Sequence, residues 1–390
     1  MKSADVVVIG GGVIGTSIAF RLAQQGRKTI LIEKGAIGAA TSGSCDKAVF
    51  LQSKKPGFHL ELAKASREVY ENLEEELQTP FEFQKCGGMI VIETEAQLEF
   101  MQKFVKEQQQ ANIPIELLSR KEALTLQPNL SPHILGATWG SEDAEVNPLL
   151  LSYAFVKAAK SNGAEIISHT EVTGIATING QVSCVHTTQG DIATAAVINA
   201  GGPFAPKISE MVGIDLPIQP RRGVILITEK VAPFLKGNVL CAQYITAKHL
   251  HKEANVNDNP YGIGLSLGQT ESGNLLIGGS REFKGFNREV GPVLLESIAQ
   301  HACRIFPSLG SIRLIRTMVG FRPFTGDGLP IIDRAPEIAG YYIAAGHEGD
   351  GIALSPITGH LVSCLLDGGG PYNHLLDHLR LSRFQPVVAN

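Results

Sequence analysis

Three glycines near the N-terminus have the spacing of a phosphate-binding turn. Gly10, Gly12 and Gly15 form a Gly-x-Gly-x-x-Gly pattern directly after an apolar run over residues 5–9. In such a pattern the first glycine makes a tight turn, the second lets a pyrophosphate approach the backbone, and the third lets a helix pack against the strand. Glu33 follows at the end of a second apolar run, where a carboxylate can accept both hydroxyls of a ribose.

The elements around these residues complete a dinucleotide-binding unit. Residues 5–9 and 29–32 are apolar enough for two buried strands, and residues 16–25 have the apolar face of a helix that ends at Gly26. The amides and the positive dipole end of that helix are expected to face the phosphates. Strand, turn, helix, strand and acid together are far more specific than the glycines alone. The pattern does not distinguish NAD from FAD.

Composition narrows the class of protein. The 390 residues are enough for two or three domains, and 44% hydrophobic with 18% charged residues is a globular composition. A net charge of -4 without a basic stripe argues against nucleic acid as a partner. The six cysteines are scattered, so we expect no metal site and a reducing cytoplasm. We also expect no signal peptide and no membrane span, because no segment reaches about 18 apolar residues.

Two later segments are expected at the same edge of the sheet. The loop over residues 35–44 is small and rich in hydroxyls, and Thr41 and Ser42 could extend the phosphate cradle. A surface loop is the alternative, but ligands bind at this edge of such sheets. A further apolar strand runs into a glycine corner at Gly201, which could also meet the cofactor.

Four segments, in this order, resemble the FAD-dependent D-amino-acid oxidase, glycine oxidase and sarcosine oxidase family. They are the N-terminal fingerprint, residues 197–203, Gly320-Phe321-Arg322-Pro323 with residues 327–330, and residues 346–359. The resemblance covers nearly the whole chain. Within the family, residues 269–274, 279–283 and 347–351 look most like the flavoprotein subunits of opine oxidases and hydrogen cyanide synthase.

The resemblance implies FAD as cofactor and an α/β fold, α+β overall, of the glutathione-reductase-like type. A Rossmann-like FAD-binding domain would comprise residues 1–80, 145–216 and 318–390. A discontinuous antiparallel-sheet domain for the substrate would comprise residues 81–144 and 217–317.

The candidate cofactor-binding residues come from the glycine corners and the segments beside them. They are Gly10, Gly12, Val13, Ile14, Gly15, Glu33, Lys34, Thr41, Ser42, Val172, Ala200, Gly201, Gly346, Gly349, Asp350, Gly351 and Ile352.

The resemblance further implies oxidation of a C–N bond to an imine by hydride transfer to the flavin. The substrate would be a D-amino acid, an N-substituted glycine, a proline-type amino acid or an opine. Arg322 would grip the substrate carboxylate, since a guanidinium fork suits a carboxylate; a structural ion pair is the alternative. His347 and Glu348 would lie close to the flavin ring, either as a polar wall or as groups that help deprotonate the substrate ammonium.

Some positions depart from the family pattern. Glycine oxidases carry an arginine where this chain has Gly349, and an active-site tyrosine near the position of Ser266, so glycine is a doubtful substrate. Arg281 aligns beside the substrate pocket, and our hypothesis is that Arg281 and Arg322 together hold a substrate with two carboxylates. The lysine with which monomeric sarcosine oxidases activate oxygen has no clear counterpart. This favours a dehydrogenase that passes electrons to a companion subunit or a quinone.

Two other functions remain open at this point. One is an NAD(P)-binding dehydrogenase, against which the C-terminal glycine loop over residues 346–351 counts. The other is a flavin-binding subunit without activity, against which the retention of Arg322 counts. The expected location is the cytoplasm, with peripheral contact to the inner membrane as an alternative.

Overall fold

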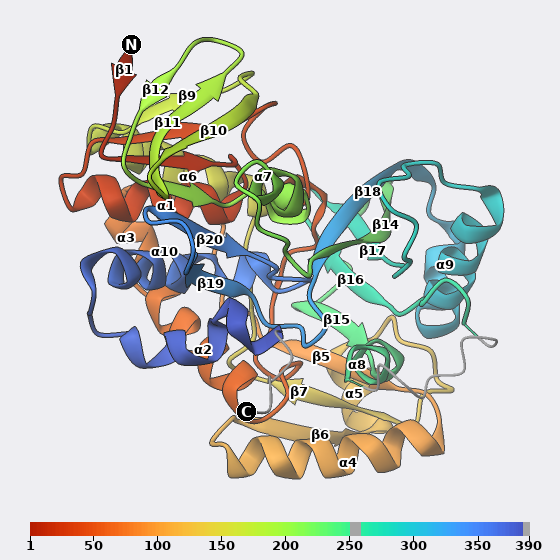
Figure 1. Cartoon of the computed structure of the whole chain (residues 1–390). Helices are drawn as coiled ribbons and strands as arrows, with labels where there is room; N and C mark the ends of the chain where they lie inside the picture. The colour runs from red at the N-terminus through yellow and green to blue at the C-terminus, as the bar shows by residue number, and fades with distance from the viewer. Residues whose placement is uncertain (250–258, 385–390) are drawn as a thin grey trace.

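A six-stranded sheet forms the centre of the N-terminal fingerprint region. The computed structural model describes residues 1–249 and 259–384 (Figure 1). The strand order is β19 (Ile331–Arg334), β20 (Tyr341–Ala345), β13 (Val197–Asn199), β2 (Val6–Ile9), β3 (Thr29–Ile32) and β9 (Glu165–Ile167). All neighbours run parallel except β19 and β20. Every residue of β2 and β3 is buried, as expected for a parallel sheet covered on both faces.

The two faces of this sheet are covered differently. Helices cover one face: α1 (Val13–Gln24), α6 (Pro148–Ser161) and α10 (Gly351–Asp367), with α2 (Phe58–Tyr70) and α3 (Leu73–Leu77) packed outside them. A second, four-stranded sheet covers the other face, in the order β1 (Lys2–Ser3), β12 (Ile192–Ala193), β11 (Gln181–Thr187) and β10 (Val172–Ile178). Because a mostly parallel sheet lies between helices and a further sheet, the predicted α/β class is confirmed.

Helices α1 and α10 pack closely because their contact residues are small. A Cβ atom on Gly359 would lie 2.7 Å from the Ser17 hydroxyl and 2.8 Å from Arg21 Cγ. The Ser17 hydroxyl donates to the Ser355 carbonyl at 2.7 Å, so a hydrogen bond joins the two helices at this crossing. The close crossing fixes the N-terminus of α10 relative to that of α1.

A proline inside α10 leaves one carbonyl without its amide donor, and hydroxyls of α10 and α2 donate to it instead. Pro356 has no N–H to donate to the Ile352 carbonyl four residues earlier. The Tyr70 hydroxyl donates to that carbonyl at 2.6 Å, and the Ser66 hydroxyl donates to the Ala353 carbonyl at 2.6 Å. Both donors lie on α2, so this helix holds the first turn of α10 in place.

The rest of the chain builds an eight-stranded sheet, at the right and the bottom of Figure 1. Its order is β18 (Leu314–Phe324), β14 (Gln219–Lys230), β17 (Asn274–Gly278), β16 (Ser266–Gln269), β15 (Asn238–Cys241), β5 (Gly88–Ile92), β7 (Gly136–Gly140) and β6 (Ile115–Ser119). Only β15 and β5 pair in parallel among these neighbours.

Helices pack on both sides of the eight-stranded sheet. One face carries α9 (Pro292–Ile305) and α5 (Arg120–Leu126), and the other carries α4 (Glu95–Gln110) and α8 (Ala242–His249). A small ladder of β4 (Ala48–Val49) and β8 (Ala144–Glu145) is separate from both large sheets, and α7 (Ala205–Glu210) follows β13. Within the described ranges, no helix has the length and apolarity that crossing a membrane requires.

Strand β18 crosses the domain boundary predicted between residues 317 and 318. It pairs with β14 from Gln219 opposite Phe324 to Thr228 opposite Leu314, so its whole length belongs to the eight-stranded sheet. The segment that carries Arg322 is therefore the edge strand of that sheet. The division into two discontinuous domains stays a prediction.

The close contact at Gly15 gives a test of this packing. A Cβ atom there would lie 1.9 Å from the Gly10 carbonyl oxygen, so Gly15→Ala must push α1 away from β2. We expect the free energy of unfolding to fall by about 1–3 kcal/mol, the usual cost of overpacking. Urea denaturation measures it. Gly369→Ala is the control, because nothing lies within 4 Å of a Cβ atom at Gly369; equal losses in both variants would contradict the packing described.

Candidate active site

The carboxyl ends of the parallel strands open on a cavity of about 530 Å³. Ile9 and Gly10 at the end of β2, Glu33 after β3 and Ala200 after β13 all line it. Strand β18 and the start of α10 contribute the rest of the wall, through residues such as Arg322. Ligands of open α/β sheets bind outside the carboxyl ends of the strands, so this cavity is the candidate site.

The glycines of the first turn serve different steric needs. Gly10 has a φ of 115°, and a Cβ atom there would lie 2.4 Å from the Ala200 carbonyl oxygen. A Cβ atom on Gly12 would have the Ser42 hydroxyl, at 3.2 Å, as its nearest neighbour, so this side of the turn is open. Gly12, Val13 and Ile14 line the cavity at the N-terminus of α1. An open backbone at a helix N-terminus fits the diphosphate of FAD.

The acid after β3 is held at the same edge. The two carboxylate oxygens of Glu33 accept from the Gly11 amide at 2.6 Å and the Gly35 amide at 2.7 Å. Lys34 also lines the cavity and pairs with Glu171 at 2.9 Å. The donors and acceptors at this end fit the adenosine half of FAD, and Val172, Thr41, Ser42 and Gly201 line the same cavity.

The C-terminal glycine loop divides into lining and supporting residues. Gly349, Gly351 and Ile352 line the cavity. Gly346 lies behind it with a φ of 84°, and a Cβ atom there would lie 2.6 Å from Thr325 Cγ2. Asp350 precedes the first residue of α10 and forms an ion pair with the buried Lys54 at 2.5 Å. Asp350 and Gly346, like Gly15, are not among the lining residues.

His347 is a buried neutral wall of the cavity. Burial lowers its pKa to about 3, despite the opposing charge of Asp350. The Thr358 hydroxyl donates to the Leu354 carbonyl at 2.8 Å, so its oxygen accepts from His347 Nε2 at 3.0 Å. The imidazole therefore carries its proton on Nε2 and is a weak base.

The carboxylate charge of Glu348 is paired within the protein. It is buried, has a φ of 50° and forms an ion pair with Arg221. Its other oxygen accepts from the Gly349 amide. Arg221 is itself packed 4.6 Å above the Phe324 ring. A left-handed backbone at a non-glycine residue costs free energy and is commonest at functional sites, and here it directs a paired carboxylate toward the cavity.

Arg322 presents its guanidinium to the cavity. Its Nη1 donates to the Ser280 carbonyl at 3.1 Å, and its remaining donors have no hydrogen-bond partner among residues 1–249 and 259–384. A Cβ atom on Gly223 would lie 2.3 Å from Nη1, so the absent side chain makes room for it. Burial would lower the pKa of Arg322, but the charge of Glu348, followed by those of Tyr244 and Asp46, raises it. The guanidinium is a permanent cation ready to bind an anion.

Arg281 lies outside the cavity lining. Its guanidinium carbon is 3.8 Å from the centroid of the Tyr244 ring, and Tyr244 is the residue that lines the cavity. The buried Arg281 Nε has no hydrogen-bond partner in the described structure. From the sequence, Arg281 is expected beside the substrate pocket. In the structure Arg281 lies behind Tyr244 and supports the ring of that residue.

Several lining residues escaped the sequence analysis, and Tyr244 and Asp46 are two of them. Tyr244 lies in α8, inside a stretch whose strand patterns gave no reason to expect an active-site helix. Asp46 lies just beyond the hydroxyl-rich loop and accepts from the Ser266 hydroxyl at 2.6 Å. In the sequence, the one local sign of Asp46 is its position as a charged residue just after the hydroxyl-rich loop over residues 35–44.

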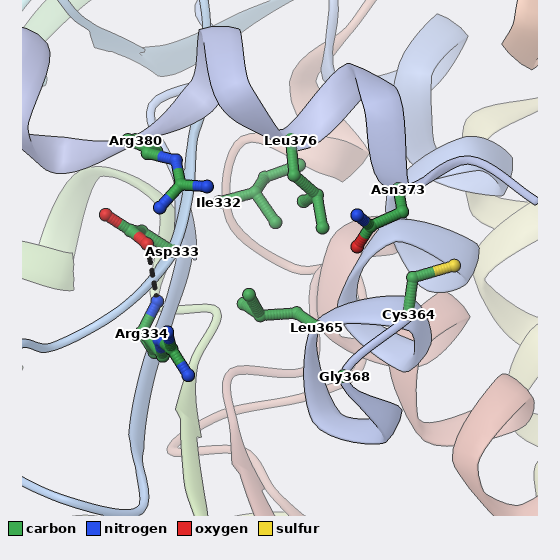
Figure 2. A pocket seen from close by; sticks show the side chains of 9 residues that line it. All are labelled: Ile332, Asp333, Arg334, Cys364, Leu365, Gly368, Asn373, Leu376 and Arg380. Atoms are coloured by element: carbon green, nitrogen blue, oxygen red, sulfur yellow. Dashed lines mark hydrogen bonds between the residues drawn. The ribbon is translucent and has the colours of Figure 1, made fainter. Parts of the chain in front are cut away.

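A smaller pocket of about 140 Å³ lies between β19, the C-terminal end of α10 and residues 373–379 (Figure 2). Asp333 accepts from the Arg334 and Leu381 amides at 2.9 Å, and Arg380 pairs with Asp377 at 2.6 Å. Asp333 and Arg380 of this pocket are thus engaged with the protein itself. It has none of the glycine corners and is not the candidate site.

Comparisons with known proteins agree with this geometry. A glycine oxidase of Bacillus licheniformis is 29% identical, with 99% of each chain covered. Hydrogen cyanide synthase subunit HcnC of Pseudomonas aeruginosa is 28% identical over 94% of this chain and 93% of that protein. The crystal structure of L-proline dehydrogenase from P. horikoshii superposes with a TM-score of 0.87 at 26% identity, covering 98% of both chains.

The family model for FAD dependent oxidoreductases, DAO, matches residues 5–365. This match spans the six-stranded sheet, the eight-stranded sheet and the whole cavity. It confirms the family that the glycine corners resemble. The chain therefore belongs to the DAO family of FAD-dependent oxidoreductases, and FAD is its cofactor.

Proposed function

We propose that this enzyme oxidises the C–N bond of an amino or imino acid and that Arg322 binds the carboxylate of the substrate. The observation that carries the proposal is the Arg322 guanidinium, which lines the cavity and has donors without protein partners. Bound FAD supplies the chemistry by accepting a hydride from the carbon that bears the amine. The relatives named glycine oxidase and L-proline dehydrogenase support this class of substrate.

The other cavity residues would orient the substrate and tune the site. The N-terminus of α10 opens on the cavity, and its partial positive charge would favour negative charge on the reduced cofactor. His347 and Glu348 act as walls, because one is neutral and the other is paired with Arg221. All the candidate cofactor-binding residues that line the cavity keep their proposed role, while Gly15, Gly346 and Asp350 hold the loops that contact FAD.

The arrangement does not support a joint grip of Arg281 and Arg322 on two carboxylates. Arg281 stacks on Tyr244 and is not among the lining residues. We therefore propose a substrate with one carboxylate at Arg322, with Arg281 positioning the Tyr244 ring. Gly349 lies beside Arg322, where a Cβ atom would be 3.7 Å from Arg322 Nε. The absence of a side chain at Gly349 leaves room for substituents larger than those of glycine.

The proposed electron acceptor is supported by the name of one relative. HcnC is by its name one subunit of a larger enzyme, which supports a companion subunit or a quinone as acceptor for this chain. A cytoplasmic location, with or without peripheral contact to a membrane, fits either acceptor.

Replacement of Arg322 tests the proposed function. Anaerobic reduction of the holoenzyme flavin is followed by absorbance with a panel of glycine, D- and L-amino acids, N-methylglycine, proline and dicarboxylic opines. We expect wild-type protein to bleach with at least one of them. Arg322→Met should raise the Kd of that substrate at least 100-fold, about 3 kcal/mol for a lost charged hydrogen-bonded contact.

Arg316→Met is the matched control, since Arg316 lies on the same strand but is exposed. It should bleach like the wild type. The proposal is wrong if no member of the panel reduces the wild-type flavin, or if Arg322→Met and Arg316→Met behave alike.

The neutral state of His347 predicts a dependence of stability on pH. Its folded pKa of about 3 is below the value of about 6.5 for an unfolded histidine. As pH falls through 6.5 the unfolded chain takes up a proton that the folded chain does not, so stability decreases with decreasing pH. By pH 5 this residue accounts for about 2 kcal/mol, from about 1.4 kcal/mol per pH unit.

Urea denaturation of His347→Asn and wild type at pH 7 and pH 5 measures this share. The variant should lose about 2 kcal/mol less than the wild type between the two pH values. His133→Asn, which replaces an exposed histidine, should lose as much as the wild type. An unchanged loss in His347→Asn would mean that the folded imidazole is protonated.

A further inference from the structure

Asp46 lies just after the hydroxyl-rich loop over residues 35–44, in the part of the chain that reaches the cavity wall. The residue follows a short 3-10 turn over Ser42–Ser44 and precedes β4. Its side chain lines the cavity together with Arg322 and Tyr244. One carboxylate oxygen accepts from the Ser266 hydroxyl at 2.6 Å, and the other has only a long contact, 3.4 Å, with the Ala48 amide.

Asp46 differs from the other carboxylates that line the cavity. Glu33 has both oxygens on backbone amides, while Glu171 and Glu348 are each paired with a basic side chain. Among the residues that the structure describes, Asp46 is the one lining carboxylate with neither a cationic partner in contact nor two short amide bonds. A carboxylate in such a site retains the capacity to bind a cation.

Within the part of the chain that the structure describes, the cavity is thus lined by an anion and a cation that form no ion pair with the protein. Asp46 and Arg322 line the same cavity, and the charge of Asp46, after those of Glu348 and Tyr244, raises the pKa of Arg322 against the effect of burial. Within residues 1–249 and 259–384, the Arg322 side chain hydrogen-bonds to the Ser280 carbonyl alone, so Asp46 and Arg322 form no ion pair. A ligand that carries a carboxylate and an ammonium on one carbon would complement both groups.

We propose that Asp46 binds the substrate ammonium and accepts its proton before oxidation. The inference rests on the proposed function and specifies its substrate as the zwitterionic form of an amine with at least one N–H. An ammonium has no lone pair, so it must lose a proton before a hydride can leave the neighbouring carbon. The N–H bond breaks and the proton goes to Asp46 Oδ1. The hydrogen of the C–H bond then leaves with the bonding electron pair as a hydride, which bound FAD would accept, while the nitrogen lone pair forms the C=N bond of an iminium that water hydrolyses.

The remaining candidates for this role are engaged elsewhere. His347 is neutral, with a pKa of about 3, and bonded to Thr358. Glu348 is paired with Arg221. Ser266 holds Asp46 in place and is a positioning residue, since its hydroxyl bonds the oxygen opposite to the proposed proton acceptor.

Asp46→Asn removes the charge, while its amide oxygen can still accept from Ser266. Each holoenzyme is titrated by anaerobic calorimetry with L-proline against cyclopentanecarboxylate, and with glycine against acetate; each pair differs by the amine. We expect the wild type to bind the amino acids at least tenfold tighter than the acids without amine. Asp46→Asn should lose that preference and leave the Kd of the plain acids within twofold. Asp46→Glu should restore part of it.

Rapid reduction of the flavin supplies the second measurement. In Asp46→Asn the limiting rate should fall at least tenfold at pH 7 and rise with pH toward the pKa of the free amine. Glu116→Gln, which replaces an exposed carboxylate on β6 that does not line the cavity, should keep the wild-type binding preference and pH profile. A variant whose melting temperature and flavin content match the wild type excludes a folding defect.

The outcomes separate this inference from the proposed function. If no amino acid reduces the wild-type flavin, the proposed function fails, while the binding preference still tests Asp46. The assignment of Asp46 is wrong if Asp46→Asn weakens the plain acids as much as the amino acids, or if it changes neither the binding preference nor the pH profile.

Discussion

The close crossing of α1 and α10 is the contact on which the cavity depends. Both helices start at the carboxyl edge of the six-stranded sheet, and both point their N-termini into the same cavity. Gly359 removes the side chain at the crossing, and the Ser17 hydroxyl joins the two backbones. Because Pro356 leaves the Ile352 carbonyl without its helical donor, Tyr70 from α2 completes the junction. Two positive dipole ends are thereby held at fixed separation, which is what a long anionic cofactor requires.

Charge in the cavity is divided between groups that the protein neutralises and groups that it leaves for a ligand. Glu348 and Arg221 satisfy each other on one wall, and Asp350 and Lys54 do so behind the glycine loop. Isolated charges are costly to desolvate, so pairing them is the default for a buried site. Arg322 and Asp46 are exceptions that face the cavity. In the proposed function, the free energy spent on leaving them unpaired would be recovered when a zwitterion binds, and the pair would then select amino acids over simple amines or acids.

The sequence allowed the cofactor half of the site to be predicted more fully than the substrate half. Gly10, Gly12 and Glu33 belong to one unit of strand, turn and helix, in which spacing along the chain decides spacing in space. The substrate wall instead depends on contacts between distant segments. Asp46 meets Ser266 across 220 residues, and Tyr244 and Arg281 come from different elements of the eight-stranded region. No local pattern fixes such contacts, and the resemblance to a family led to Arg322 but not to Tyr244 or Asp46.

The pairing of β14 with β18 determines the surroundings of the proposed substrate arginine, which the sequence did not reveal. Arg322 lies directly opposite Arg221 in this ladder, and side chains of opposed residues share one face of a sheet. Two adjacent cations would repel, but the Glu348 carboxylate takes up Arg221, and the gap at Gly223 lets the Arg322 guanidinium pass over the neighbouring strand. Glu348, from the loop that precedes α10, thus leaves the donors of Arg322 available. The Arg221–Glu348 ion pair therefore links the loop at the start of α10 to the pair of strands that carries the proposed carboxylate-binding group.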